Sequence, residues 1–322
     1  MAIEGKRIVL TGGAGFIGSQ LAKRLVEKNE VVIYDNGHRN ALKHASLENH
    51  ANLTVIWGDV LDREAVSKAI AGSHIVVHLA AIAGVDMVMS MPSHCMRVNL
   101  FGTLNVLDAC VEHKVSRMVD FSTSEVFGSY VYKAEEHTAT QLGEVGESRW
   151  TYAVSKLAAE HMTYSYHKEH GIQTVTIRPF NVYGPQQVGI GAIHVFVVRA
   201  LKGKEILIHG DGNQIRSWCY VDDMVAGALL CLEKEEAVGH VFNIGNPRAT
   251  ITTAHLAEQI KRLSASDSPV VFDEIGYPDV ELRIPSIKKA QNILGYRPQV
   301  DLEEGLLRTI EWYRRIGMEE DD

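Results

Sequence analysis

The first 120 residues repeat a pattern of short apolar runs separated by longer amphipathic stretches. The runs are rich in β-branched residues and do not alternate with polar ones, which is typical of parallel strands covered by helices on both faces. The stretches between them are long enough for helices. The runs are Arg7–Thr11, Val31–Tyr34, Leu53–Trp57, Ile75–Leu79 and Arg117–Phe121. The pattern therefore predicts a parallel sheet whose strands are joined by helices.

The pattern changes in the second half of the chain. Ile172–Arg178 is predicted to be a sixth strand that ends at Pro179. Beyond Pro185 the segments are shorter, and they predict strands at Glu205–Ile208 and Val241–Asn243 and helices at Ala192–Lys202, Val221–Glu233, Thr252–Leu263 and Leu302–Ile316. We expect residues 1–184 to form one domain and residues 185–322 a smaller, intertwined, mixed α/β lobe that binds the substrate. The charged segment Tyr130–Arg149 has little periodicity and is expected to form a lid.

A glycine-rich segment follows the first predicted strand. Gly12, Gly15 and Gly18 are spaced three residues apart, and Phe16 and Ile17 open a predicted helix. Glycines in this context permit a tight turn, close approach of backbone N–H groups to a pyrophosphate, and close packing of the helix on the sheet. The segment therefore predicts a dinucleotide-binding domain, a Rossmann-type doubly wound α/β fold.

The ends of the next strands complete the expected cofactor site. Asp35 follows the second strand, where a carboxylate can accept hydrogen bonds from both ribose hydroxyls of adenosine and would repel a 2′-phosphate. NAD is therefore favoured over NADP, although the nearby Arg39 is a cation that a 2′-phosphate could use. Further contacts are expected from Asn36, Asp59, Val60, Leu79, Ala80 and Ala81.

Tyr152 and Lys156 are one helical turn apart on one face of a predicted helix. A free phenol has a pKa near 10 and is a poor base at neutral pH, but a nearby ammonium and a nicotinamide cation stabilise the phenolate. Tyr152 can then remove a proton from a sugar hydroxyl while the hydride leaves the same carbon for NAD. Lys156 can also hold the nicotinamide ribose.

Polar residues at the end of the fifth strand are expected to face the same sugar. Open α/β sheets bind ligands at the carboxyl ends of their strands, which places Ser122 at the cofactor and Thr123, Ser124 and Glu125 at the substrate. A hydroxyl of Thr123 or Ser124 can donate to the oxygen on which Tyr152 acts. Glu125 can do acid–base work beside C5 and C6 of a hexose, or it can simply cap the following loop.

Composition narrows the class of protein. Forty acidic residues against 32 basic ones give a net charge of −8, which does not favour nucleic acid as a partner. The four cysteines, Cys95, Cys110, Cys219 and Cys231, are widely separated and suggest neither a zinc site nor a disulfide framework; no metal site is predicted among the histidines either. With no signal-peptide pattern and no long apolar window, we expect a cytoplasmic protein without membrane contact.

The ordered motifs together carry a family resemblance. TGGAGFIG, YDN, GDV, HLAA, NLFGT, STSEVFG, YAVSK, RPFNVYGP and GDGNQIRSWCYVDD occur in this order between Arg7 and Trp312. The chain resembles the extended short-chain dehydrogenase/reductase family of nucleotide-sugar epimerases, dehydratases and decarboxylases. The resemblance implies an enzyme that keeps NAD bound, oxidises a sugar carbon, usually C4, and commonly returns the hydride.

The resemblance also implies roles for several residues. Asn99 shapes the cofactor region, while Pro179 and Asn181 line the nicotinamide and nucleotide-sugar side. Arg216 pairs with the diphosphate of the sugar nucleotide. Arg283 reaches phosphate or, in the decarboxylases, the sugar carboxylate, since guanidinium groups suit either anion.

Three reactions of a 4-keto sugar remain open. Glu125 argues against a simple 4-epimerase, and Ser124 stands where glucose-type 4,6-dehydratases have an Asp, although GDP-mannose-type dehydratases resemble Thr-Ser-Glu. Similarity to UDP-glucuronate decarboxylases is greatest around Thr123–Glu125, Arg149–Tyr152 and Asp279–Ser286, whereas Gln186–Ala192 is shorter than in the branch that makes a 4-keto-pentose. Decarboxylation of UDP-glucuronate to UDP-4-keto-pentose or UDP-xylose is favoured. A non-catalytic NAD sensor or scaffold is disfavoured because Tyr152 and Lys156 are both present.

Two long helices suggest an oligomer. The helices expected at Pro92–His113 and Tyr152–His170 carry apolar residues over more than one stripe. In the family that the chain resembles, the corresponding helices of two subunits form a four-helix bundle, so we expect a homodimer.

Overall fold

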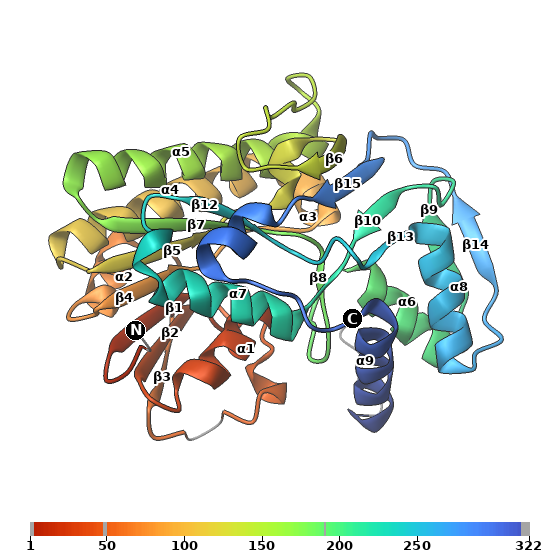
Figure 1. The fold of residues 1–322 in the computed structure, drawn as a ribbon, viewed down its shortest axis with the longest axis horizontal. Coiled ribbons are helices and arrows are strands. Elements are labelled where there is room, and N and C mark those ends of the chain that lie inside the picture. The colour runs from red at the N-terminus through yellow and green to blue at the C-terminus, as the bar shows by residue number, and fades with distance from the viewer. Residues whose placement is uncertain (1–2, 48–49, 190, 317–322) are drawn as a thin grey trace.

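The computed structural model describes residues 3–47, 50–189 and 191–316. Within these ranges, the main architectural element is a seven-stranded parallel sheet of order β12-β7-β5-β4-β1-β2-β3 (Figure 1). Its strands are β1 (Arg7–Thr11), β2 (Glu30–Asp35), β3 (Leu53–Trp57), β4 (Ile75–His78), β5 (Arg117–Phe121), β7 (Gln173–Pro179) and β12 (Val241–Ile244). The α/β fold with a parallel central sheet is confirmed.

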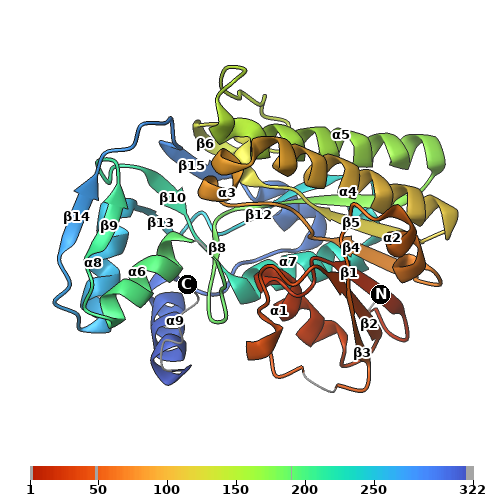
Figure 2. The ribbon, with the colours of Figure 1, turned by 180° about the vertical axis from the view of Figure 1, so that it is seen from behind.

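Helices cover both faces of this sheet. Figures 1 and 2 show α1 (Phe16–Leu25) and α7 (Val221–Glu233) on one face, and α2 (Arg63–Ile70), α4 (Pro92–Glu112) and α5 (Thr151–His170) on the other. Alternate residues of β1 belong to different cores, since Ile8 and Leu10 pack in one hydrophobic cluster and Val9 in the other. This two-sided burial explains the unbroken apolar runs in the sequence.

Helix α3 (Val85–Ser90) packs against α4, and most of the remaining strands and helices form a smaller lobe beside the carboxyl ends of the strands (Figures 1 and 2). Its largest sheet has the order β13-β10-β15-β6. Two short pairs, β8 with β11 and β9 with β14, and the helices α6, α8 and α9 complete it. The bounds are β6 (Tyr130–Ala134), β8 (Val182–Tyr183), α6 (Ala192–Leu201), β9 (Ile206–His209), β10 (Ile215–Ser217), β11 (Cys219–Tyr220), β13 (Thr250–Thr252), α8 (Thr253–Ser264), β14 (Val270–Asp273), β15 (Leu282–Pro285) and α9 (Leu302–Ile316).

The predicted strands and helices are present, with small shifts at their ends, but two expectations were wrong. Val241–Asn243 was expected in the smaller lobe, whereas β12 lies beside β7 as the seventh strand of the large sheet. The segment Tyr130–Arg149 was expected to be irregular, but it begins with β6, which pairs in parallel with β15; its role as a lid remains a prediction. In both cases the partner strand is distant in sequence, so local periodicity carries no signal for the pairing. The division at residue 184 remains a prediction, and β12 and α7, from beyond it, belong to the large sheet and its helix layer.

Three further features limit the kinds of site that the described residues can form. No helix among them is long and apolar enough to cross a membrane. No group of three or more acidic, histidine or cysteine side chains in these ranges could hold a metal ion. All four cysteines are buried and free.

Candidate active site

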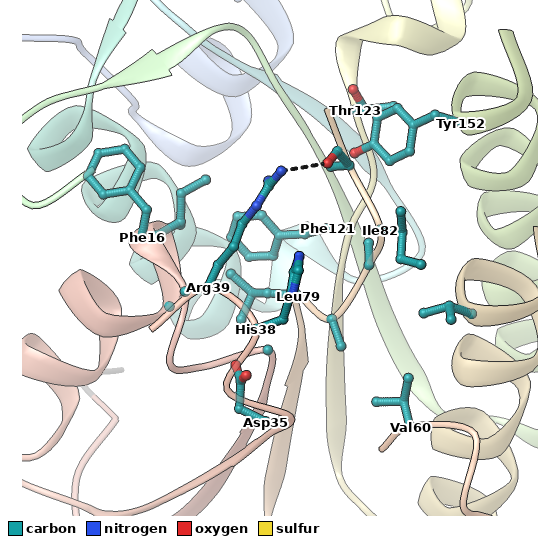
Figure 3. Close-up of a pocket in the computed structure, with 18 of the residues that line it drawn as sticks. Phe16, Asp35, His38, Arg39, Val60, Leu79, Ile82, Phe121, Thr123 and Tyr152 are labelled. Carbon is teal, nitrogen blue, oxygen red and sulfur yellow. Dashed lines mark hydrogen bonds between the residues drawn. The ribbon is translucent and has the colours of Figure 1, made fainter. Parts of the chain in front are cut away.

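A cavity of about 490 Å³ lies at the carboxyl ends of the central strands (Figure 3). It extends from the turn after β1 to the ends of β5 and β7. Most residues predicted to bind cofactor or substrate line it. They are Gly12, Gly15, Phe16, Ile17, Gly18, Asp35, Asn36, Asp59, Val60, Leu79, Ala80, Ala81, Ser122, Thr123, Ser124, Glu125, Tyr152, Pro179 and Asn181.

The glycine-rich segment after β1 leaves no room for side chains at two of the three glycines predicted to bind the cofactor. Gly12 has φ of 71°, and a Cβ there would lie 2.5 Å from the backbone nitrogen of Ala80. A Cβ at Gly18 would lie 2.6 Å from the Cα of Gly13. At Gly15 the nearest such atom is the Gly12 oxygen at 3.3 Å, so this residue borders the cavity. A backbone cradle followed by the N-terminus of α1 suits a pyrophosphate, which fits NAD.

Asp35 is held in place by the backbone of two loops. Its carboxylate accepts hydrogen bonds from the N–H groups of Ala14, at 2.9 Å, and Gly37, at 2.8 Å. Burial raises the pKa of Asp35, and these hydrogen bonds oppose that change. The carboxylate therefore has a fixed position at the end of β2, facing the cavity, where it can accept from ribose hydroxyls.

Arg39 reaches across the cavity from the loop after β2. Its guanidinium donates to the carbonyl of Ala83 at 3.0 Å, near Thr123 and Tyr152 and away from Asp35 (Figure 3). Burial lowers the pKa of Arg39. In this arrangement Arg39 does not add positive charge beside the Asp35 carboxylate, where a 2′-phosphate would need it.

Tyr152 and Thr123 lie close together in the cavity wall (Figure 3). Burial raises the pKa of the Tyr152 phenol above its usual value; a hydrogen bond with the Thr123 side chain opposes this rise, and the charge of Glu125 adds to it. The chain alone thus leaves Tyr152 protonated at neutral pH. A positive charge beside the phenol is needed for it to act as a base.

Glu125 is clamped by two arginines. It lines the cavity and forms ion pairs with Arg149, at 2.8 Å, and with Arg283. Burial alone would raise the pKa of Glu125, but the charges and hydrogen bonds of Arg283 and Arg149 outweigh it and lower this pKa to about 2. Glu125 is therefore a fixed negative charge at neutral pH and a weak base.

The clamp extends to two more charged residues. Asp279 pairs with Arg149 at 2.8 Å and with Arg216 at 3.3 Å. Three guanidinium groups are thus compensated by two carboxylates. The Nε atoms of Arg149 and Arg283 and one terminal nitrogen of Arg216 are buried without a hydrogen-bond partner in the described structure. The cluster has one positive charge in excess and unused donors, which favours an incoming anion.

Four predicted site residues lie behind the cavity wall. Asn99 is buried, accepts from the backbone N–H of Ile82 at 2.8 Å and donates to Ser155. Lys156 is 1 % exposed and pairs with Asp120. Arg283 is 1 % exposed and bonds Glu125 and the Gly128 carbonyl, while Arg216 pairs with Asp279. Their assigned contacts with cofactor or substrate remain predictions.

The sequence did not assign a role to Arg149 or Asp279. Arg149 lies 24 residues from Glu125 and 130 from Asp279, so no spacing in the chain connects them. Further cavity residues, including Ile82, Ala83 and Met87, directly follow the HLAA motif after β4. Their position after a strand end was the signal that could have identified them.

Comparison with known proteins agrees with this geometry. The model of the NAD dependent epimerase/dehydratase family matches residues 8–245. This chain belongs to that family. The match covers both the glycine-rich turn and the Tyr152 region, and it makes the protein an NAD-dependent enzyme that acts on nucleotide sugars.

Three relatives illustrate the range of this enzyme family. A UDP-N-acetyl-alpha-D-glucosaminuronate decarboxylase from Bacillus cytotoxicus is 33% identical over 97% of this chain and 98% of its own length. UDP-glucuronic acid decarboxylase 6 from Arabidopsis thaliana is 36% identical over 97% of this chain and 90% of its own. The crystal structure of UDP-glucuronic acid 4-epimerase from Bacillus cereus, in complex with UDP-glucuronic acid and NAD, has a TM-score of 0.88 and 29% identity, covering 96% of this chain and 99% of that one.

Proposed function

We propose that this enzyme transiently oxidises C4 of a UDP-hexuronate and releases its C6 carboxylate as CO2. The observation that carries the proposal is the arginine clamp around Glu125, which lies in the same cavity wall as Tyr152 and Thr123. UDP-glucuronate is the favoured substrate, because UDP-glucuronic acid decarboxylase 6 is among the relatives described above, and a second relative decarboxylates another UDP-linked uronate.

The clamp supports a substrate that carries a carboxylate. A second carboxylate beside an unpaired Glu125 would be repelled, but Arg149 and Arg283 neutralise this residue, and Arg216 adds the excess positive charge. We assign Arg283 to the substrate carboxylate and Arg216 to the diphosphate, each through donors that the present contacts leave unused. Both guanidinium groups would shift from their present contacts when the substrate binds.

The chain's own residues would do the proton chemistry. Bound NAD supplies the reversible oxidant for C4. Tyr152 removes the proton of the C4 hydroxyl, Thr123 donates a hydrogen bond to the same oxygen, and the Lys156 ammonium stabilises the phenolate. The resulting C4 ketone is β to the C6 carboxylate and accepts the electron pair as the C5–C6 bond breaks. CO2 leaves, and the enolate then takes up a proton at C5. Return of the hydride to C4, with the proton held on Tyr152 going back to the C4 oxygen, would give a UDP-pentose and restore the oxidant for the next cycle.

The other two reactions fit less well. A dehydratase needs a base that removes the C5 proton and an acid for the C6 hydroxyl, but the arginine clamp makes Glu125 a weak base and Ser124 is no acid. A 4-epimerase needs only the Tyr152 and Thr123 set and room for the keto sugar to turn over. It is the second candidate, because the epimerase from Bacillus cereus also binds a UDP-hexuronate.

The test is to incubate the purified enzyme separately with UDP-glucuronate, UDP-glucose, UDP-N-acetylglucosamine and GDP-mannose and to follow the products by mass and NMR. We expect UDP-glucuronate to lose CO2 and the other three to remain unchanged. Loss of water from a neutral sugar would favour a dehydratase. An unchanged mass with a new sugar signal from UDP-glucuronate would favour the epimerase, and either result would overturn the proposal.

The proposal includes a cytoplasmic homodimer. Helices α4 and α5 pack side by side, and they leave Phe101, Val154 and Tyr164 substantially exposed. A second copy placing the same two helices against these residues would bury them in a four-helix bundle. Light scattering should give twice the chain mass of 35.6 kDa, and Phe101→Lys with Tyr164→Lys should give the single-chain mass. A single-chain mass for the unaltered protein would contradict the dimer.

A further inference from the structure

A buried carboxylate lies beneath the helix that carries Tyr152 and Lys156. Asp120 is on β5, a central strand whose five residues are all buried, and is itself 0 % exposed. Neither of its carboxylate oxygens has a hydrogen-bond partner among the described residues. Burial raises the pKa of Asp120, and the charge of Lys156 opposes that rise. An ionised carboxylate buried in this way is costly unless a cation compensates its charge.

The compensating cation is Lys156. Its Nζ lies 3.6 Å from Oδ1 of Asp120, and both side chains are buried. A buried ammonium likewise needs a charge of opposite sign beside it. Glu160, one turn further along α5, is already occupied by Arg178, which donates to both of its carboxylate oxygens at 2.9 and 2.7 Å. In the described structure Asp120 is therefore the carboxylate that compensates Lys156.

We propose that Asp120 is a positioning residue that holds the Lys156 ammonium and compensates its charge, so that this ammonium can stabilise the Tyr152 phenolate. The proposal rests on the roles assigned to Tyr152 and Lys156 under the proposed function. It does not depend on which nucleotide sugar reacts. Asp120 lies outside the cavity lining and acts through Lys156.

The other charged and titratable groups around this pair do not replace Asp120. His78 on β4 is buried and bonded to Thr11 and Thr103, and burial together with the charge of Lys156 lowers its pKa to about 3, so it is neutral. Burial raises the pKa of Cys95 on α4, so its thiol is also neutral. The charged groups left near Tyr152, Lys156 and Asp120 are Glu125, which is clamped by arginines, Arg39, and the Glu160–Arg178 pair.

The test is a titration of the Tyr152 phenolate by its near-ultraviolet absorbance in the NAD-saturated protein. Subtracting the titration of Tyr152→Phe isolates this one phenol. The same measurement is made on Asp120→Asn and on Asp120→Asn with Tyr152→Phe. The charge of Asp120 by itself raises the pKa of Tyr152, so its direct loss would lower the midpoint. Without the carboxylate, however, the Lys156 ammonium is no longer held and compensated, and we expect the loss of its effect on the phenolate to outweigh the direct one and to raise the midpoint by roughly one to three pH units.

Two outcomes would overturn the proposal. A lower titration midpoint for Tyr152 in Asp120→Asn would mean that the charge of Asp120 acts mainly on the phenol directly. An unchanged midpoint would mean that Asp120 has only a packing role. As a control, Asp120→Asn in a Lys156→Met protein should not raise the midpoint. Because the titration needs no sugar nucleotide, a wrong substrate assignment would leave its result intact.

A second measurement covers the case in which Asp120→Asn folds poorly. Lys156→Met alone leaves the Asp120 carboxylate buried and unpaired, so this protein should melt at a lower temperature than the unaltered one. Adding Asp120→Asn to Lys156→Met should recover part of the lost melting temperature. If the two substitutions instead destabilise additively, the side chains are not coupled and the proposal fails.

Discussion

The turn after β1 gives a matched pair of substitutions that separates folding from cofactor binding. Gly12→Ala places a Cβ 2.5 Å from the backbone of Ala80 at a residue with φ of 71°. The left-handed conformation costs an alanine about 1–2 kcal/mol, and overpacking adds about 1–3 kcal/mol. We therefore expect Gly12→Ala to lower the free energy of unfolding by about 2–5 kcal/mol and to abolish NAD binding.

Gly15→Ala is the matched control for this change. Its φ of −69° suits alanine, and the nearest atom to the new Cβ lies 3.3 Å away. The free energy of unfolding should stay within about 1 kcal/mol of the unaltered value. The new methyl group would nevertheless project toward the space assigned to the pyrophosphate, so NAD should bind at least roughly tenfold more weakly.

The assay combines denaturant unfolding of the NAD-free proteins with calorimetric titration of NAD. We expect Gly12→Ala to be impaired in both stability and NAD binding, and Gly15→Ala to be impaired in NAD binding alone. If Gly15→Ala bound NAD like the unaltered protein, the pyrophosphate would not lie on this turn. If Gly12→Ala were as stable as the unaltered protein, the close approach of the turn to Ala80 would be wrong.

Three further predictions concern single side chains. Glu125→Gln should lower the free energy of unfolding at pH 7 by about 3 kcal/mol, because the pKa of Glu125 is about 2 in the folded protein and ordinarily 4.5. This stabilisation is complete above pH 4.5 and is lost as the pH falls toward 2. If the stability of the two proteins changed with pH in parallel, the prediction would be refuted. Burial lowers the pKa of His78 to about 3. As the pH falls below 6.5, only the unfolded chain takes up a proton at this residue, so the folded protein should lose stability. His78→Gln should lack this part of the dependence of stability on pH, and an identical dependence in urea titrations of the two proteins would contradict the assignment. Asp35→Ala should weaken NAD binding and reduce the preference for NAD over NADP, and an unchanged ratio of the two dissociation constants would exclude the ribose contact.

The large sheet and the cofactor cavity were predictable because their signals are local. A buried parallel strand needs a mostly apolar run without regular polar alternation, so Ile75–Leu79 and Arg117–Phe121 were visible in the sequence. Parallel strands also bring their carboxyl ends to one edge, which is why Gly12, Asp35 and Thr123 line a single cavity. No knowledge of distant contacts was required for either step.

Contacts between distant parts of the chain could not be predicted in this way. Arg283 reaches Glu125 across 158 residues because β15 pairs with β6, and nothing in the local pattern indicates that pairing. The same holds for β12, whose partner β7 is separated from it by much of the smaller lobe. The role of Asp120 was not visible for a different reason: its charge in a buried strand can be interpreted only once the structure shows Lys156 beside it.

The most direct test of the account is the release of labelled CO2 from UDP-glucuronate that carries ¹³C in its carboxyl group. Protein that has been loaded with NAD and freed of excess cofactor should release many equivalents of ¹³CO2, and Tyr152→Phe should be slower by roughly 10²–10⁴-fold while still binding NAD. Equal rates for the two proteins, or no labelled CO2 from the unaltered enzyme, would contradict the claim that C4 oxidation at Tyr152 drives loss of the carboxylate.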